Sequence, residues 1–185
     1  MFRYRMLAAT ILGLAAIFTA VQAGGTLKSG PQLGQDVPGP FHPLNVTGEK
    51  KGEKACLYCS NGANPVAVVF AREATPAVAN LLKQLDEATA KNSKASMGSY
   101  AVFCSDANGL DKQLEKLATD QKLTKLVLAI DNPAGPEKYK IAKDADVTVV
   151  FYLDFEVKAN HAFKKGDLTD AAVTKVVADV AKIVK

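Results

Sequence analysis

Three apolar runs, each bounded by turn-forming residues, predict strands that are buried on both faces. They span residues 65–71, 99–104 and 126–130 and are rich in Val, Ile, Phe and Tyr side chains. A continuous apolar run of this length is typical of a strand with other layers packed against both of its faces. We therefore expect three core strands in this part of the chain.

Apolar residues at helical spacing predict a helix after each of the first two strands and another at the end of the chain. Thr75 is expected to cap the first of these helices, with Pro76 at the first helical position, where its missing N–H group is not needed. This helix is predicted to run to about Asn92, the second from Leu110 to near Lys122, and the last from Thr169 to about Val184.

The segment before the last helix predicts a strand hairpin. Residues 147–153 form another apolar run, Asp154-Phe155 turns the chain, and residues 156–163 alternate, with Val157, Ala159, His161 and Phe163 on one face. A short helical turn is expected at 139–142, before the hairpin. Strands joined through helices are parallel with right-handed crossovers, and the hairpin adds an antiparallel edge. The order predicts an α/β fold: a three-layer sandwich with a mixed central sheet and helices on both faces.

The amino-terminal part of the chain predicts two segments that precede this domain. Arg3 and Arg5 come before an apolar run at 6–21 that ends in Val21-Gln22-Ala23, the pattern of a secretory signal peptide cleaved after Ala23. Residues 24–64 are rich in Gly and Pro and predict an entry arm of loops and short edge strands. The globular domain is expected at 65–185, and the mature protein is expected to be secreted or periplasmic, without membrane association.

Composition and charge narrow the class of protein. The chain has 185 residues, of which 48% are hydrophobic and 23% charged. This balance is that of one globular domain and excludes a disordered chain, a collagen and a multi-span membrane protein. The net charge is only +4, and the lysines are scattered among acidic residues, so nucleic-acid binding is not expected.

The order of these elements resembles the redoxin branch of the thioredoxin-like proteins, the group that includes alkyl hydroperoxide reductase and thiol-specific antioxidant domains. Residues 33–38 with Phe41, and later 46–48, resemble the entry arm of that group, and 65–70 its first core strand. Residues 102–106 are similar to the second strand with its Ser-x-Asp ending, and 146–154 to the late strand and turn. The resemblance covers nearly all of the mature chain and implies a thioredoxin-like architecture.

The departures from this family concern its usual active site. A redoxin peroxidase has a thiolate in the turn after the first core strand, but residues 71–77 contain no cysteine. Val147 stands where the family has its cis-proline, and Asp146 where redoxins place an Arg that supports the thiolate. Both halves of the usual site are missing, so peroxidase activity is not expected.

Cys56 and Cys59 form a C-x-x-C pair outside the usual site. In an exported thioredoxin-like protein this spacing favours thiol-disulfide exchange, with either cysteine as the attacking thiol and the other resolving. An equally weighted alternative is a structural disulfide that pins the arm. The pair precedes the first core strand, about 20 Å from the other end of the sheet, and no helix is expected to begin beside it. The nearby Lys50, Lys51 and Lys54 would favour a thiolate.

A metal site is a further alternative for the pair, although no cofactor is expected. A closed zinc site needs four ligands, and His42 and His161 are far apart in the sequence without motif spacing. Copper needs fewer ligands, so it stays open.

Four other candidate residues are expected at the edge where the usual site would lie, and a fifth, His161, lies on the hairpin. Cys104 ends the second strand and is either a packed hydrophobic residue or a partner thiol. Arg72 and Glu73 occupy the turn of the missing site and either bind an anion or pair with each other, and Thr75 follows them in this turn. His161, on the hairpin, is expected to be a partly buried histidine with satisfied hydrogen bonds.

Two functions follow from these residues. The first is an exported thioredoxin-like protein that exchanges disulfides with a protein thiol or disulfide partner through Cys56 and Cys59. The second is a non-catalytic binding module of the same fold in which the disulfide is structural.

Overall fold

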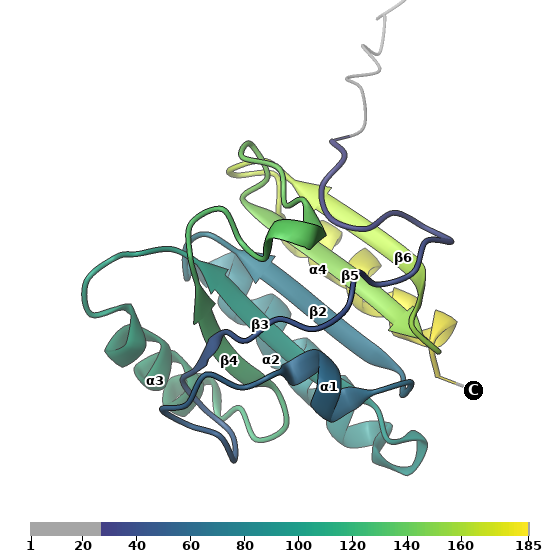
Figure 1. Ribbon diagram of the computed structural model, residues 1–185, viewed down its shortest axis with the longest axis horizontal. Helices are drawn as coiled ribbons and strands as arrows, with labels where there is room; N and C mark the ends of the chain where they lie inside the picture. The colour runs from purple at the N-terminus through teal and green to yellow at the C-terminus, as the bar shows by residue number, and fades with distance from the viewer. Residues whose placement is uncertain (1–26, 185) are drawn as a thin grey trace, which may run out of the picture.

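A mixed six-stranded sheet organises the computed structural model, which describes residues 27–184 (Figure 1). The strand order is β1-β4-β3-β2-β5-β6. The neighbours β2, β3 and β4 are parallel, whereas β1, β5 and β6 each run antiparallel to the strand beside them. The strands are β1 Leu44–Asn45, β2 Val66–Ala71, β3 Gly98–Cys104, β4 Val127–Asp131, β5 Val147–Leu153 and β6 Glu156–Phe163. The predicted α/β fold with a mixed sheet is confirmed.

Threonine side chains cap the starts of α2 and α4. The helices are α1 Leu57–Asn61, α2 Pro76–Lys91, α3 Leu110–Gln121 and α4 Asp170–Ala178, with 3₁₀ turns η1 Ser93–Ala95, η2 Glu137–Tyr139 and η3 Asp179–Lys182. Thr75 Oγ1 accepts a hydrogen bond from the Val78 N–H, and Thr169 Oγ1 accepts one from the Ala172 N–H. Each cap satisfies a donor that has no partner inside the helix.

The three longer helices cover one face of the sheet. Since β2, β3 and β4 follow each other in one direction with right-handed crossovers, α2 and α3 must lie on the same side. Leucines of both helices and valines of α4 share one buried cluster with this face of the strands. In Figure 1 the helices lie behind the sheet, and the arm and α1 pass in front of it.

The second face is covered by the arm, α1 and η2 instead of a long helix. Phe41, from the arm, packs edge-on against Tyr139 of η2 with ring centroids 4.9 Å apart, and lies over Phe70 and Tyr100 of the sheet. The Tyr139 hydroxyl donates to the Gly39 carbonyl over 2.8 Å. An aromatic layer from irregular segments thus replaces a helix on this face.

The predicted alternation along β6 is wrong at one point. A bulge in the pairing of β5 with β6 leaves Val157 opposite Tyr152 and Ala159 opposite Phe151. Val157 therefore packs on the face that the arm covers, while Ala159 packs on the face of the three longer helices. A bulge adds one residue to a strand and so reverses the face of the residues beyond it.

The structure tests the sequence-based prediction at the carboxyl end of the chain but not at its amino end. The last α-helix stops at Ala178 and the chain continues as η3, so the single helix predicted to reach Val184 is two segments. The predicted signal peptide lies outside the described residues. Among those residues, no helix has the length and apolar character that a membrane span requires.

Candidate functional site

A disulfide joins Cys56 to Cys59 at the start of α1. Their Cα atoms lie 5.2 Å apart. Cys56 is the N-cap of this helix, and its Sγ accepts a hydrogen bond of 3.0 Å from the Cys59 N–H. The prediction that no helix begins beside the pair was wrong. The five-residue α1 is too short and too polar to show a helical pattern, and it forms here because its apolar side packs on the sheet.

The two sulfurs differ in their access to solvent. Cys59 is exposed, whereas Cys56 is half-buried. The orientation follows from helix geometry, because Leu57 is buried on the sheet and Cys59, two residues later, lies on the other side of α1. Tyr58 packs against Phe155 with ring centroids 5.5 Å apart. These contacts fix α1 on the sheet and leave Cys59 exposed.

Asn61 holds the other end of α1 against the beginning of β3. Its Nδ2 donates to the Leu57 carbonyl over 2.7 Å, and its Oδ1 lies where a Cβ on Gly98 would stand. Any side chain at position 98 would therefore collide with it. Sequence reasoning missed this pair, because a glycine that opens a strand gives no signal of a contact made 37 positions earlier.

The disulfide lies far from the third cysteine. α1 contacts the amino end of β3, whereas Cys104 is the last residue of that strand. A strand of this length spans about 20 Å. Cys104 therefore cannot exchange with the Cys56–Cys59 bridge within one molecule.

Two of the three lysines expected to favour a thiolate are paired with acidic residues. Lys50 lies 3.9 Å from Glu53, and Lys51 lies 2.7 Å from Glu115 of α3. All of these side chains are well exposed, so each pair contributes little to stability.

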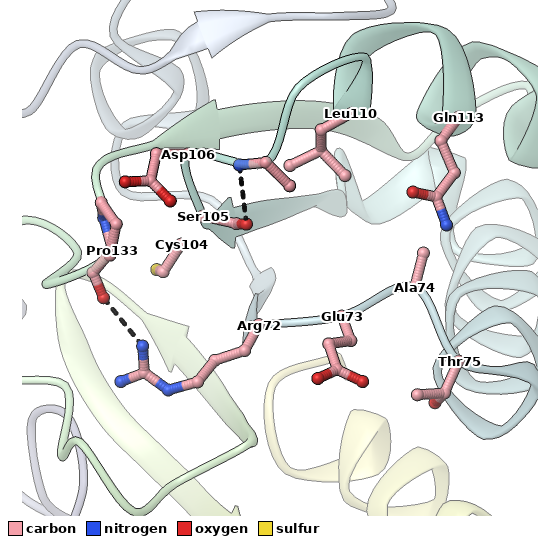
Figure 2. A pocket seen from close by; sticks show the side chains of 11 residues that line it. Arg72, Glu73, Ala74, Thr75, Cys104, Ser105, Asp106, Leu110, Gln113 and Pro133 are labelled. Atoms are coloured by element: carbon pink, nitrogen blue, oxygen red, sulfur yellow. Dashed lines mark hydrogen bonds between the residues drawn. The ribbon is translucent and has the colours of Figure 1, made fainter.

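The turn that follows β2 stands where redoxins carry their active-site cysteine. It borders a cavity of about 510 Å³ at the carboxyl ends of β2 and β3 (Figure 2). Arg72 does not pair with Glu73 there, because Glu73 pairs with Lys165 instead. Its guanidinium donates to the carbonyls of Ala145, Pro133 and Ala142 over 2.9, 2.8 and 3.0 Å. These bonds fasten Arg72 to the loop between β4 and β5, and the anion site stays a prediction.

The other residues of this turn also have structural partners. Glu73 lies 2.8 Å from the Lys165 ammonium, and Thr75 caps α2. Cys104 borders the cavity but is only 3% exposed. Burial raises the pKa of its thiol to about 12, against the opposing charge of Arg72.

The two positions that the sequence matches to the cis-proline and the Arg of redoxins lie beside this turn. Val147 pairs with Ala71 across β5 and β2, at the end of the first core strand. Burial and the neighbouring Glu73 carboxylate raise the pKa of Asp146 above its usual value. A carboxyl group here would repel a thiolate at this position.

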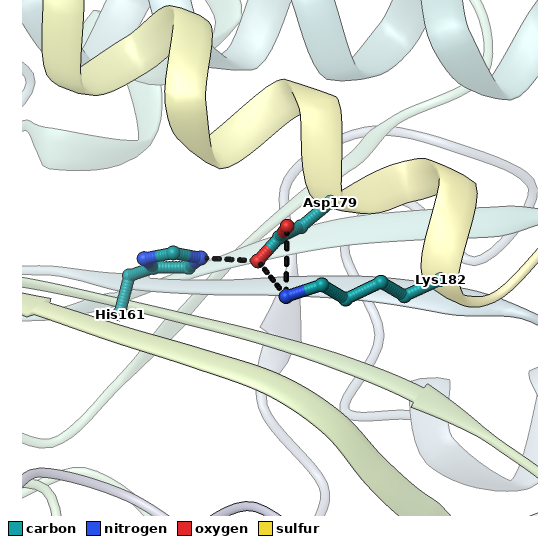
Figure 3. Close-up of polar contacts among 3 residues, drawn as sticks. All are labelled: His161, Asp179 and Lys182. Carbon is teal, nitrogen blue, oxygen red and sulfur yellow. Dashed lines mark hydrogen bonds and ion pairs between the residues drawn. The ribbon is translucent and has the colours of Figure 1, made fainter.

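His161 takes part in a small charged cluster with η3 (Figure 3). Its Nε2 lies 2.8 Å from Oδ2 of Asp179, and the Lys182 ammonium lies 2.9 Å from Oδ1 of the same carboxylate. Burial raises the pKa of Asp179, but the hydrogen bonds from Lys182 and His161 outweigh it and the pKa is lowered. Within residues 27–184, no group of three or more His, Cys, Asp or Glu side chains is arranged to hold a metal ion.

Comparison with known proteins identifies the fold. Similar solved structures include a candidate protein disulfide isomerase from Bacteroides thetaiotaomicron, with a TM-score of 0.63, 13% identity, and coverage of 85% of this chain and 94% of that one. Peroxidoxin BcpB from Mycobacterium tuberculosis has a TM-score of 0.59, 15% identity, and coverage of 86% and 99%. The fold is thioredoxin-like.

A third similar structure is a secreted disulfide oxidoreductase of Mycobacterium tuberculosis homologous to E. coli DsbE, with a TM-score of 0.54 and 14% identity. The match covers 75% of this chain and 94% of that one. No protein-family model and no curated protein matches the sequence. The thioredoxin-like fold is thus shared with oxidoreductases and with peroxide-reducing proteins, and the site must be argued from this chain's own residues.

Proposed function

We propose that the protein is an exported thiol-disulfide exchange protein of the redoxin branch, acting through Cys56 and Cys59. The observation that carries the proposal is the asymmetry of the bridge. Cys59 is exposed, and the sulfur of the half-buried Cys56 accepts a hydrogen bond from the Cys59 N–H. An accessible sulfur is open to attack, and a hydrogen-bonded sulfur is the better leaving group.

The exchange is a pair of thiol-disulfide substitutions. A partner thiolate attacks Sγ of Cys59, the Cys56–Cys59 bond breaks, and its electron pair stays on Sγ of Cys56 as a thiolate. A second thiolate from the partner then attacks the mixed disulfide at the partner's sulfur, which releases an oxidised partner and the Cys59 thiolate. The reverse sequence reduces a partner disulfide, with Cys59 attacking and Cys56 resolving.

The size of the closed loop supports exchange over a structural role. The two cysteines are three positions apart, so the bridge closes a very short loop. In the chain-entropy description, such a loop stabilises a fold by about 2 kcal/mol, less than a bridge that closes a long segment. α1 is already held by Leu57, Tyr58 and Asn61, so the bridge is not needed to attach it.

Export rests on the amino-terminal pattern at 1–23, and a secreted protein is among those of similar fold. Absence of peroxidase activity rests on the turn at 71–77, which has no cysteine, and on the burial of Cys104. The expected partner is a protein thiol or disulfide, and neither nucleic acid nor a membrane surface is expected to bind.

A redox titration against glutathione and dithiothreitol, with mass spectrometry to locate the bridge, tests the proposal. We expect reduction of Cys56–Cys59 between about −120 and −270 mV. The variant Cys56→Ser should accumulate a mixed disulfide on Cys59, whereas Cys104→Ser, the matched control, should exchange like the wild type. A bridge that is reduced only below about −300 mV would contradict exchange.

That last result would favour the alternative, a binding module with a structural disulfide. One observation speaks for it: the bridge lies at the amino ends of the core strands, opposite the edge where the family site would be. In that case the wild-type protein would show no exchange, and Cys56→Ser would only lower its stability.

A further inference from the structure

The turn between β5 and β6 has a backbone conformation that most side chains disfavour. Leu153 pairs with Glu156, so a loop of two residues joins the strands. These two residues, Asp154 and Phe155, have φ angles of 51° and 65°. A two-residue loop with both φ angles positive is a type I′ turn, which favours Asn followed by Gly. A bulky residue is strained at a positive φ, so the chain keeps Phe155 here at an energetic cost.

The backbone of this turn is tied to the segments on either side of α1. The Asp154 N–H donates to the Ala63 carbonyl over 3.0 Å, and the Val37 N–H donates to the Phe155 carbonyl over 2.7 Å. Both hydrogen bonds use backbone atoms only, so a glycine at position 155 would keep them and would remove the strain. These bonds therefore do not explain why the position holds a phenylalanine, and the contacts of its ring must do so.

The ring of Phe155 packs against Tyr58, which lies between the two cysteines of the bridge in the sequence. The ring centroids are 5.5 Å apart and the ring planes are inclined by 42°, in the range of a favourable aromatic pair. Leu57 and Asn61 attach α1 to the sheet, but Tyr58 is the residue joined directly to Cys59 by a peptide bond. The ring thus restrains the segment that carries the exposed cysteine.

We propose that Phe155 is a positioning residue for the Cys56–Cys59 pair, and that its ring keeps the two thiols close together when the bridge is reduced. The inference rests on the proposed exchange function. In the oxidised protein the Cα atoms of the pair are 5.2 Å apart, a separation at which a disulfide forms. A reduced pair held near this separation gives each thiol a high effective concentration at the other. The contact therefore favours the disulfide over the dithiol.

The step that this contact favours is the closure of the bridge. The Cys59 thiolate attacks glutathione disulfide, which leaves a mixed disulfide on Cys59 and releases one glutathione as a thiolate. The Cys56 thiolate then attacks Sγ of Cys59, the bond from Cys59 to glutathione breaks, and the second glutathione leaves as a thiolate. Two electrons and two protons pass overall from the pair to glutathione. The Phe155 ring makes none of these bonds and acts only through the position of Tyr58.

The equilibrium between the dithiol and the disulfide in glutathione and dithiothreitol buffers, read by mass spectrometry, tests the inference. Without the aromatic pair, Phe155→Gly should make the bridge about fivefold easier to reduce, which raises its reduction potential by about 20 mV. The mixed disulfide of this variant with glutathione should close about fivefold more slowly. Phe155→Tyr keeps an aromatic ring and should restore the wild-type values.

Asp154→Gly is the matched control, because it relieves the other positive φ of the same turn and leaves the ring in place. Its potential should equal that of the wild type. Tyr58→Leu removes the same contact from the side of α1, and the double variant with Phe155→Gly should shift no further than Tyr58→Leu alone. This pair of variants also tests the contact if Phe155→Gly alone does not fold.

The outcomes separate this inference from the exchange function. An unchanged potential in Phe155→Gly, an equal rise in Asp154→Gly, or additive shifts in the double variant with Tyr58→Leu overturns the positioning role. A purely structural role would lower the stability of the oxidised and reduced forms alike and leave the potential unchanged. A bridge that glutathione does not reduce overturns the exchange function alone, because the shift in Phe155→Gly is then still measured against dithiothreitol.

Discussion

The three cysteines have different chemistry because their surroundings differ. Cys59 is exposed, Cys56 is half-buried with a hydrogen-bonded sulfur, and Cys104 is enclosed at the end of β3. Gly135 approaches Cys104 so closely that a Cβ on this glycine would lie 3.2 Å from its sulfur. The loop between β4 and β5 therefore closes over the only thiol near the family's usual site.

Native Cys104 is expected to resist alkylation. With its pKa at about 12, roughly one thiol in ten thousand is ionised at pH 8, and burial also blocks access to the reagent. Iodoacetamide should label Cys104 only after unfolding in guanidinium, as read by mass spectrometry. Cys59 in the protein reduced with dithiothreitol is the internal control and should react in the native state. Labelling of both at similar rates would contradict the enclosure of Cys104.

At the scale of elements, α1 depends on a contact with β3. Its five residues do not form a stable helix alone, and Gly98 leaves the space that Asn61 occupies. The position of the disulfide thus depends on β3 having a glycine, which carries no side chain, at position 98.

Gly98→Ala is expected to lower the free energy of unfolding by about 2 kcal/mol, because the added methyl group displaces Asn61. Urea denaturation measures this change. The double variant with Asn61→Ala should recover part of the loss, since the colliding oxygen is then gone. Additive losses in the double variant would show that Asn61 does not contact position 98.

The cluster of His161, Asp179 and Lys182 makes the attachment of η3 to β6 sensitive to acid. The pKa of Asp179 is lowered in the folded protein, so its carboxylate stabilises the fold above its unfolded pKa of about 3.9. This contribution is lost as the pH falls through the lower, folded pKa.

Asp179→Asn should therefore reduce stability by about 1 kcal/mol at pH 7, with the difference from wild type shrinking as the pH falls through the lowered, folded pKa of Asp179. Thermal unfolding across this pH range provides the measurement. Asp120→Asn, which breaks an exposed pair with Lys116, is the control and should change little at any pH. A loss for Asp179→Asn that stays constant down to the acid unfolding of the protein would contradict the charge-based explanation.

At the scale of the whole molecule, Arg72 joins parts of the chain that are 61 to 73 positions apart. Its backbone N–H also donates to the Asp146 carbonyl over 3.0 Å. The end of β2 is thereby fastened to the loop between β4 and β5, which closes the edge where the family site would be.

Arg72→Met is expected to lower the free energy of unfolding by about 3 kcal/mol, because three carbonyls lose their donors. Arg72→Lys should recover only a minor part, since an ammonium lacks the planar fork. Urea denaturation gives both values. Added phosphate tests the predicted anion site. A clear rise in the stability of the wild-type protein that disappears in Arg72→Met would support it, and no rise would contradict it.

The elements whose own residues carry a strong pattern could be predicted from the sequence. The strands of the domain and the helices α2 and α3 begin and end within a few residues of the prediction, because β-branched runs and the Thr75-Pro76 cap act locally. Prediction failed where a distant contact decided the outcome. The bulge at Phe151 and Tyr152 reverses the face of Val157, and no local signal marks it.

The sequence by itself determined the thioredoxin-like fold and the presence of a close cysteine pair. Hydrophobic periodicity and cysteine spacing are properties of short segments. Only the tertiary structure decided that Cys56 caps a helix and that Arg72 is held by three carbonyls. These outcomes depend on which distant backbone groups meet when the arm packs on the sheet, and hydrogen bonds of that kind leave no periodic trace in the sequence.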